Sequence, residues 1–249
     1  MIDEGRLIKS ILLTRPSGQN FDLINLFTNI NAKVYELPAI EIKALSPPKL
    51  PPSLPSRYYD RVIFISTNAV QYGWPLVQNY INLDTTLFSI GEGSGKALER
   101  LANRPVSYPQ PKTDSEALLS MDKWHSIDGL TVLICRGQGG REWLKEALET
   151  RGAKVDYLEC YIRNQPKLNL STFDNAMADQ AVILIMSIES LSNLWHSLDS
   201  HRLDQLTKKV FLVTHERIKD YAIQLGIKRI YLTENNHQAI INTWRKIAI

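Results

Sequence analysis

Short apolar runs alternate with longer stretches of helical period along almost the whole chain. The apolar runs predict strands at residues 11–14, 33–36, 62–65, 87–90, 131–135, 154–159, 181–186, 209–213 and 228–232. The stretches between them predict helices at residues 18–31, 68–81, 95–103, 114–124, 139–151, 170–179, 189–198, 215–225 and 237–249. Apolar strands in regular alternation with helices are typical of parallel sheets covered on both faces, so the fold class is α/β.

The chain also carries an internal repeat. Thr14-Arg15-Pro16 matches Cys135-Arg136-Gly137 at a spacing of 121 positions (136 − 15), and the same spacing aligns Ser66 with Ser187. Two copies of a β-α-β unit are therefore predicted, each followed by a strand that ends in serine and by a helix.

Two breaks in the pattern suggest domain boundaries. Residues 46–56 hold a run of prolines that excludes a helix or a central strand, so they are predicted to form an extended surface connector. A second break lies at Asn164-Gln165-Pro166. The pattern permits an α/β domain between the breaks, inserted into a discontinuous α/β domain. The expected ranges are 1–37 with 166–249 for the discontinuous domain, 44–158 for the inserted domain, and 38–43 with 159–165 for the strands that connect them.

Composition narrows the classes of function. Charged residues make up 22% of the chain, the net charge is +3, and the basic residues are scattered singly, so no nucleic-acid partner is indicated. No apolar window approaches the roughly 18 residues of a membrane span, and the apolar stretch at 11–13 is too short for a secretion signal. Cys135 and Cys160 lie in apolar runs without a CxxC spacing, which favours buried thiols in a reducing compartment. We therefore expect a cytoplasmic protein with no membrane partner.

One glycine-rich segment invites comparison with cofactor-binding motifs. Gly91-Glu92-Gly93-Ser94-Gly95-Lys96 follows a predicted strand and precedes a predicted helix. It fails as a dinucleotide fingerprint because Lys96 takes the third glycine position, and it fails as a P-loop because Ile90 and Ala97 stand where glycine and a hydroxyl residue belong. Two interpretations remain, a carboxylate seat at a helix N-terminus or only a tight turn. The histidines show no metal-binding spacing, so a metal site is not expected.

Polar side chains also stand at the ends of other predicted strands, where ligands bind in open parallel sheets. They are Ser66, Thr67 and Asn68, then Ser187 with Ser190, and Thr214 with Arg217. The plainer interpretation of each hydroxyl is a helix N-cap. Arg15 and Arg136 hold matching positions in the repeat, and Arg141 opens the next helix. Guanidinium groups suit bidentate carboxylate binding, and the alternative is an ion pair with an acid of the same domain.

Taken together, these residues resemble the uroporphyrinogen-III synthase family. Ser94 stands where threonine is common in the family, and Met186 stands where a hydroxyl is frequent. Apart from these two departures, the matching pieces span almost the whole chain in order. They are residues 13–16, 63–70, 90–94, 136–142, 151–155, 161–163, 187–191 and 213–218.

The resemblance implies a bilobed fold of two α/β domains around a cleft, joined by a two-stranded ladder. It implies a cofactor-free lyase that cyclises hydroxymethylbilane, an acidic linear tetrapyrrole, to uroporphyrinogen III with loss of water and inversion of the last pyrrole ring. By its place in the family motif, Tyr161 is the expected general acid, although a tyrosine there could also simply pack. The expected substrate-binding residues are Arg15, Ser66, Thr67, Asn68, Gly91, Gly93, Ser94, Arg136, Gly137, Arg141, Ser187, Ser190, Thr214 and Arg217. A monomer is expected, with hand-off of the substrate from hydroxymethylbilane synthase as a further expectation.

Other functions remain open. A non-catalytic tetrapyrrole-binding or regulatory relative would keep the two lobes, but Tyr161 and the two repeat arginines favour an enzyme. A two-lobed small-molecule sensor is disfavoured because neither an export signal nor a DNA-binding extension is evident. A nucleotide-dependent enzyme comes last, since the glycine-rich segment fails both nucleotide motifs.

Overall fold

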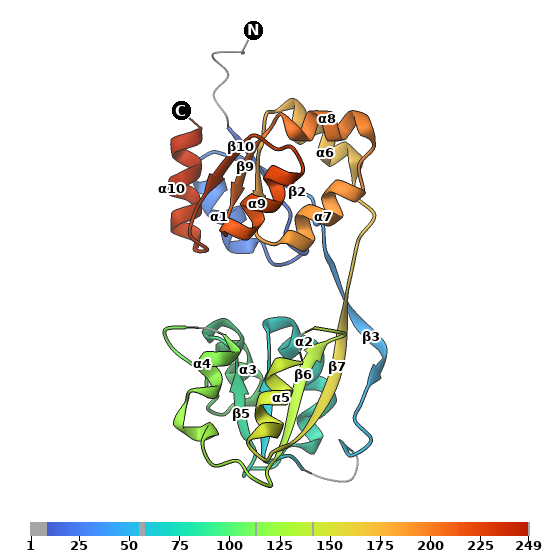
Figure 1. Ribbon diagram of the computed structural model, residues 1–249. Helices are drawn as coiled ribbons and strands as arrows, with labels where there is room; N and C mark the ends of the chain where they lie inside the picture. The colour runs from blue at the N-terminus through green and yellow to red at the C-terminus, as the bar shows by residue number, and fades with distance from the viewer. Residues whose placement is uncertain (1–8, 55–57, 113, 141, 249) are drawn as a thin grey trace. The chain divides into compact units, whose positions relative to one another are not determined.

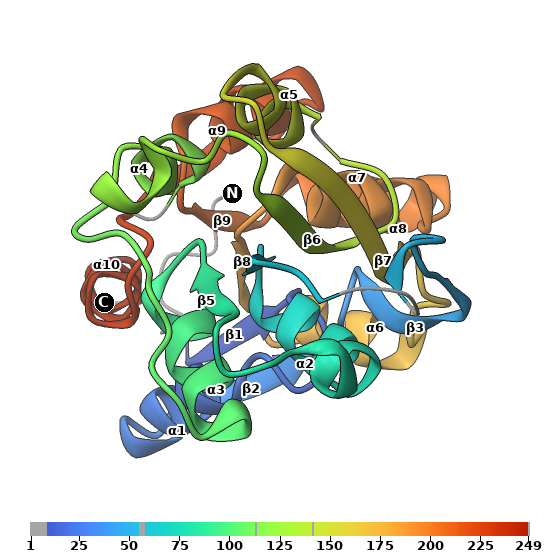
Figure 2. The same ribbon diagram turned by 90° about the horizontal axis from the view of Figure 1, so that it is seen from below.

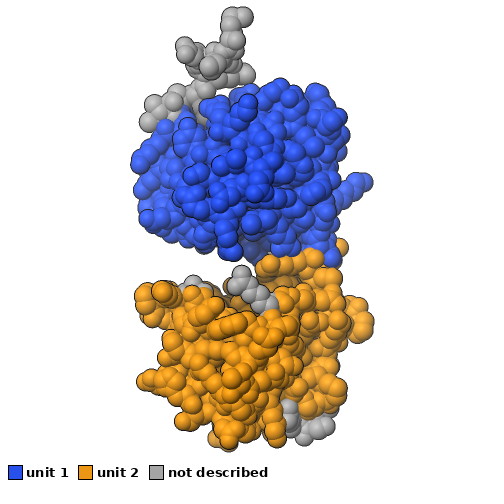
Figure 3. Space-filling model, viewed as in Figure 1, with its two compact units in different colours: residues 1–41, 164–249 blue, residues 42–163 orange. Residues whose placement is uncertain are grey.

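The computed structural model describes residues 9–54, 58–112, 114–140 and 142–248. By its internal contacts the chain divides into two compact units, which Figure 3 shows in different colours. Unit 1 comprises Met1–Glu41 and Asn164–Ile249, and unit 2 comprises Ile42–Arg163. Within the described ranges, every helix is too short or too polar to cross a membrane.

Unit 1 is built on a five-stranded sheet in the order β10-β9-β8-β1-β2, in which every pairing is parallel. Its strands are β1 (Ser10–Leu13), β2 (Lys33–Glu36), β8 (Val182–Ile185), β9 (Val210–Val213) and β10 (Arg229–Leu232). Its helices are α1 (Phe21–Asn29), α6 (Leu170–Ala178), α7 (Ile188–His196), α8 (Ser200–Thr207), α9 (Glu216–Gln224) and α10 (His237–Ile247) (Figure 1). The central strands β1, β8 and β9 are buried at every position, because helices cover both faces of the sheet.

Unit 2 has its own five-stranded sheet, in the order β3-β7-β6-β4-β5. Its strands are β3 (Glu41–Lys49), β4 (Arg61–Phe64), β5 (Thr86–Ser89), β6 (Thr131–Gly137) and β7 (Lys154–Asn164). Its helices are α2 (Thr67–Val77), α3 (Glu92–Ala102), α4 (Ser115–Leu119) and α5 (Trp143–Thr150), with 3₁₀ turns at Gln78–Tyr80 and Asp122–Trp124. Figure 2 shows α2 and α3 on one side of this sheet and α4 and α5 on the other. One core lies under each pair of helices, around Phe64 and Leu98 on the first side and around Trp124 and Leu148 on the second.

The internal repeat predicted from the sequence is present in the structure. The strand order β9-β8-β1-β2 of unit 1 has the same pattern as β5-β4-β6-β7 of unit 2. Ile63 pairs with Ile134 in unit 2, and the residues 121 positions away from them, Leu184 and Leu13, pair in unit 1. The two units therefore hold equivalent residues at equivalent places on their sheets, although the chain passes through the strands in a different sequence.

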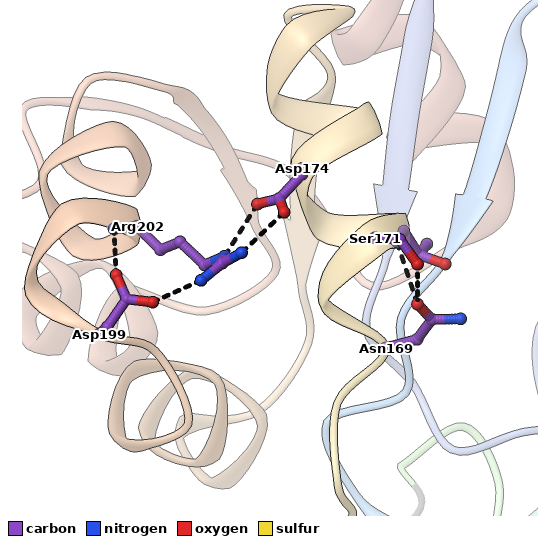
Figure 4. Close-up of polar contacts among 6 residues, drawn as sticks. Asn169, Ser171, Asp174, Asp199 and Arg202 are labelled. Atoms are coloured by element: carbon purple, nitrogen blue, oxygen red, sulfur yellow. Dashed lines mark hydrogen bonds and ion pairs between the residues drawn. The ribbon is translucent and has the colours of Figure 1, made fainter.

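Two elements depart from the sequence-based prediction. The apolar pattern does not predict α8, because Leu206 is the only fully buried residue of that helix. Other contacts place α8, as Figure 4 shows: the Asp199 carboxylate accepts the Arg202 backbone amide at 2.9 Å, and the Arg202 guanidinium makes two 2.8 Å hydrogen bonds to Asp174 of α6. The second departure is strand β3, because the prediction that residues 46–56 form only a connector is wrong for residues 46–49.

Strand β3 extends to Lys49 and includes Pro47 and Pro48. It lies at the edge of its sheet, where a missing backbone N–H breaks no ladder on the open side. The prolines thus exclude a central strand but not an edge strand.

Candidate functional site

Tyr161 lies near the end of β7 and is only 3% exposed. Its ring rests against the backbone of Gly137 on the neighbouring strand β6, where an added Cβ would come within 2.6 Å of the ring atom Cε2. The Tyr161 hydroxyl lies 3.2 Å from Ser66 Oγ. The phenol is therefore buried, which agrees with the interpretation that this tyrosine packs, and Ser66 is its polar neighbour.

Ser66 is the N-cap of α2 and is partly exposed. Its hydroxyl oxygen accepts the backbone amide of Ala69 at 3.1 Å, which satisfies one of the amides that a helix start leaves unpaired. This bond uses the oxygen but not the hydroxyl proton of Ser66. The buried hydroxyl of Tyr161 thus lies within hydrogen-bonding distance of the hydroxyl of Ser66, a residue that is partly exposed. Of the neighbouring expected residues, Thr67 is exposed and Asn68 is half-buried.

The glycine-rich segment forms the start of α3, which begins at Glu92 rather than after the glycines. The Ser94 hydroxyl donates to the carbonyl of Gly91 at 2.9 Å, so its proton is committed within the turn. An added Cβ at Gly93 would meet no atom within 4 Å. Glycine at position 95 has a packing reason, since a Cβ there would lie 2.3 Å from the Tyr108 ring. Backbone amides of the first turn of α3 stay available to an anion.

Arg136 is a buried cation at the end of β6, with 3% of its surface exposed. Its Nη1 lies 3.0 Å from a Glu142 carboxylate oxygen, its Nε donates to the Gly137 carbonyl at 3.3 Å, and its Nη2 donates to the Gly139 carbonyl. The guanidinium carbon lies 4.2 Å from the centre of the Tyr157 ring. Arg136 is therefore paired within its own unit, which was the alternative interpretation of the arginines. Arg141 lies outside the described residues.

A cavity of about 260 Å³ lies beside Arg136, entirely within unit 2. It sits at the carboxyl ends of β4, β5 and β6, on the side of the sheet that α4 and α5 cover. Its walls include Ile65, Ile90, Ile134, Trp143 and Tyr157. Sequence patterns did not indicate these wall residues, because their shared property is spatial and each alone belongs to an ordinary strand end or helix start.

The carboxyl edge of the unit 1 sheet is more polar. Arg15, two positions after β1, is partly buried, and burial lowers the pKa of its guanidinium. Arg15 makes no ion pair within the ranges that the structure describes, and Asp22 is the acidic group that acts on it electrostatically. A partly desolvated cation without a carboxylate partner is a favourable place for a ligand carboxylate.

Hydroxyl groups line the same edge at the neighbouring strands. Ser187 is the N-cap of α7, where its oxygen accepts the Ser190 amide at 3.0 Å and lies 2.9 Å from the Ser190 hydroxyl. Thr214 follows β9 and is only 4% exposed, and its hydroxyl has no hydrogen-bond partner among the residues described. An unsatisfied buried hydroxyl costs free energy, so a water molecule or a ligand oxygen that pairs with it would be bound favourably. Arg217, by contrast, is exposed on the first turn of α9.

Sequence reasoning missed Asn20, the N-cap of α1. Asn20 is 1% exposed, and its amide donates to Glu36 at 3.0 Å. Its Oδ1 atom has no hydrogen-bond partner in the described part of the chain. No sequence signal marked it, because the helix predicted over residues 18–31 placed Asn20 within its first turn. In the described ranges, no three histidine, cysteine or acidic side chains gather where a metal ion could bind.

The chain is similar to known proteins over nearly its whole length. A model of the family described as uroporphyrinogen-III synthase HemD matches residues 22–240. Uroporphyrinogen-III synthase of Escherichia coli is 30% identical over 246 residues, covering 91% of this chain and 95% of that protein. The protein of the same name in Salmonella typhimurium is 30% identical over 241 residues, with coverage of 91% and 95%.

A solved structure shows the same fold. The uroporphyrinogen-III synthetase of Helicobacter pylori aligns with a TM-score of 0.63 at 15% identity, covering 96% of this chain and 99% of that one. At this level of identity the likeness concerns the architecture alone.

Proposed function

Because this chain belongs to the uroporphyrinogen-III synthase family, we propose that it converts hydroxymethylbilane to uroporphyrinogen III. The proposed reaction closes the linear tetrapyrrole with loss of water and inversion of the last pyrrole ring, without a cofactor, which makes the protein a lyase. The observation that carries the assignment of residues is the Tyr161 hydroxyl, buried behind Ser66 at 3.2 Å.

The chemistry needs few catalytic groups. The hydroxymethyl group of the substrate leaves as water once its oxygen is protonated, and the remaining azafulvene is attacked by a carbon of the last pyrrole. Attack at the substituted carbon gives a spirocyclic intermediate, and rearrangement of that intermediate inverts the ring. Closure without inversion occurs spontaneously, so the enzyme must hold the chain in the geometry that favours the substituted carbon.

The two hydroxyls supply a route for the proton. Ser66 donates its proton to the departing hydroxyl oxygen and takes the Tyr161 proton in the same direction. Burial of Tyr161 supports this order, because Ser66, which lies 3.2 Å from its hydroxyl, is the more exposed of the two residues. General acid catalysis of this kind contributes about 10²- to 10⁴-fold in rate.

Substrate carboxylates bind at the strand edges. Arg15 and Thr214 are the strongest candidates, because one is a cation without an ion pair among the described residues and the other is a buried hydroxyl without a partner there. The further proposed contacts are Thr67, Asn68, Gly91, Gly93, Ser94, Arg136, Gly137, Arg141, Ser187, Ser190 and Arg217, several of them through backbone amides.

The two compact units are proposed to act as domains, with ranges 1–37 with 166–249 and 44–158, and with connecting strands at 38–43 and 159–165. The change of unit at Glu41/Ile42 and at Arg163/Asn164 supports these boundaries. A monomeric, cytoplasmic enzyme that receives its substrate from hydroxymethylbilane synthase completes the proposal.

The test is a coupled assay in which hydroxymethylbilane is supplied and the ratio of isomer III to isomer I is measured by chromatography after oxidation. The protein should raise the proportion of isomer III far above that in buffer, and an unchanged ratio would remove the assignment. Tyr161→Phe should slow formation of isomer III by about 100-fold or more. Tyr72→Phe is the matched control, because the Tyr72 ring lies 6.1 Å from the Tyr161 ring and its hydroxyl donates to the Ile42 carbonyl, away from the Tyr161–Ser66 pair.

A further inference from the structure

The cavity of unit 2 has the size of a single ring. Its volume is about 260 Å³, whereas a protein cavity of about 150 Å³ is enough to bind benzene. One aromatic ring with short side chains fits such a space, and a four-ring chain does not. The occupant must therefore be a monocyclic molecule or one ring of a larger one.

The walls are mostly apolar and aromatic, and besides Arg136 their polar side chains are Ser115 and Glu116 of α4. Ile65 and Ile90 directly follow β4 and β5, Ile134 lies in β6, and Trp143 and Tyr157 add two aromatic side chains. Trp143 is 42% exposed although it is a large apolar residue at the first position of α5. Flat apolar walls of this kind favour a flat apolar ring, because aromatic rings gain both burial and ring–ring contacts.

One buried cation faces this apolar space. The Arg136 guanidinium lies over the Tyr157 ring, and it is held at one end by Glu142, whose side chain is 54% exposed. Burial and the nearby Glu142 carboxylate also raise the pKa of Tyr157. A ligand carboxylate can take the place of Glu142 on Arg136, since Glu142 is free to turn into solvent while Arg136 is not.

The equivalent place in unit 1 has a different chemistry. Phe88 of β5 pairs with Ile63, and Leu212 of β9 pairs with Leu184, the counterpart of Ile63. Strands β5 and β9 therefore correspond at a spacing of 124 positions (212 − 88). At this spacing Ile90 corresponds to Thr214.

At the repeat spacing of 121, Tyr157 corresponds to Glu36, and Arg136 corresponds to Arg15. At these positions unit 1 keeps the arginine but has a threonine and a glutamate, whereas unit 2 has an isoleucine and a tyrosine. The apolar walls are a property of unit 2 and not a general consequence of the repeated fold.

We propose that the cavity of unit 2 binds one aromatic ring that carries a short carboxylate side chain, with the ring against the apolar walls and the carboxylate on Arg136. Under the proposed function, on which this identification of the ring rests, the occupant is one pyrrole of the tetrapyrrole. A free monopyrrole with acetate and propionate side chains presents the same chemistry.

Direct binding tests the cavity without requiring turnover. Phenylacetate is the probe and the neutral phenylacetamide its matched control, with binding followed by ¹H–¹⁵N NMR shifts of the Trp143 indole and of the Gly139 and Gly140 amides. Phenylacetate should shift these signals and the amide should bind at least several-fold more weakly. Glu142→Gln should tighten phenylacetate binding by up to about fivefold, the factor that an ion pair with an exposed partner commonly represents. Equal binding of both probes, or no shift at these residues, would overturn the proposal.

A cavity-filling variant tests whether the ring binds in this cavity. Ile90→Trp should abolish phenylacetate binding, whereas Leu101→Trp, which adds the same indole to a residue of α3 that is 55% exposed, should leave it unchanged. Circular dichroism and thermal melting establish that both variants fold. Retained phenylacetate binding in folded Ile90→Trp would overturn the proposal.

Turnover separates this inference from the proposed function. Loss of isomer III formation in Ile90→Trp assigns the cavity to a tetrapyrrole ring, and unchanged turnover together with lost binding assigns it to a free monopyrrole. A wild-type protein that binds phenylacetate but forms no excess of isomer III would keep the site and remove the synthase. A wild-type protein that forms isomer III but does not bind phenylacetate would keep the synthase assignment and remove the site.

Discussion

Gly137→Ala should impair catalysis by moving a neighbouring side chain. The new Cβ would lie 2.6 Å from Cε2 and 2.7 Å from Cζ of the Tyr161 ring. Carbon atoms in contact normally stand about 3.5 to 4.0 Å apart, so the ring must shift by roughly 1 Å. The Tyr161–Ser66 separation of 3.2 Å is already longer than the usual range of about 2.5 to 3.0 Å for hydroxyl pairs, and such a shift would break this hydrogen bond.

The expected effect is on the chemical step. A misplacement of about 1 Å can cost about 100-fold in rate, whereas overpacking typically costs about 1–3 kcal/mol of stability. We expect kcat for isomer III to fall by about 10- to 100-fold, KM to change little, and the chain to remain folded. Gly226→Ala is the matched control, since it also strains a glycine, at φ +85°, but in unit 1 with no atom within 4 Å of the added Cβ.

A double variant decides whether Gly137 acts through Tyr161. If it does, Gly137→Ala should have little further effect on kcat in a Tyr161→Phe background, because the hydroxyl that it displaces is already gone. Additive losses in the double variant would refute the reasoning, as would a Gly137→Ala enzyme with normal kcat. Equal losses of kcat in Gly226→Ala would trace the effect to stability instead.

Three further predictions concern other parts of the chain. Thr214→Val should slow formation of isomer III yet raise the free energy of unfolding by about 1 kcal/mol, because it removes a buried hydroxyl without a described partner; normal turnover or lower stability would count against a ligand at Thr214. Hydrogen bonds from Thr131 lower the pKa of Asp60, so its stabilisation is present above the pKa of the unfolded chain and is lost as pH falls through the lowered value. Asp60→Asn should therefore lower the melting temperature at pH 7 and have no effect in strong acid, and a constant difference across pH would contradict this. Burial raises the pKa of Cys160 to about 12 and also raises that of Cys135, so neither thiol should react with iodoacetamide until the protein unfolds, as mass spectrometry after pulse labelling would show.

The sequence predicted those elements whose burial leaves a pattern. Strands β1, β8 and β9 are buried at every position and appear as continuous apolar runs, so they were found to within a residue or two. Helix α8 was missed because only Leu203 and Leu206 pack against the core, and polar contacts of Arg202 supply much of its remaining support. The edge strand β3 was hidden by Pro47 and Pro48, which the open side of an edge tolerates.

In the candidate site, too, the sequence predicted the features that local residues show and missed those that depend on distant segments. Ser66 and Ser187 were found because a hydroxyl between a strand and a helix is visible in the local sequence, and both are N-caps in the structure. Packing was one of the two interpretations of Tyr161, but its contacts with Gly137 and Ser66 were not predicted, because these residues come from other segments of the chain. The cavity was invisible for the same reason, since its walls come from segments that only the folded sheet brings together.

The two copies of the repeat have separated chemically while keeping their geometry. Strand registers agree between the units, yet the two matching arginines differ in environment: Arg136 is paired with Glu142, and Arg15 makes no described ion pair. Thr214 offers a hydroxyl where Ile90 offers a hydrocarbon wall. A flexible acidic chain of pyrroles needs both kinds of contact, polar groups that bind its carboxylates and an apolar cavity that fixes the plane of a ring.

If the two copies have divided these roles, exchanging the chemistry of Thr214 and Ile90 should have different effects on the salt dependence of binding. Thr214→Ile should weaken substrate binding by loss of a carboxylate contact, and Ile90→Thr should weaken it by loss of apolar area, so that the first variant alone should reduce the salt dependence of KM. Equal salt dependence in both variants would show that the two edges bind the same part of the ligand.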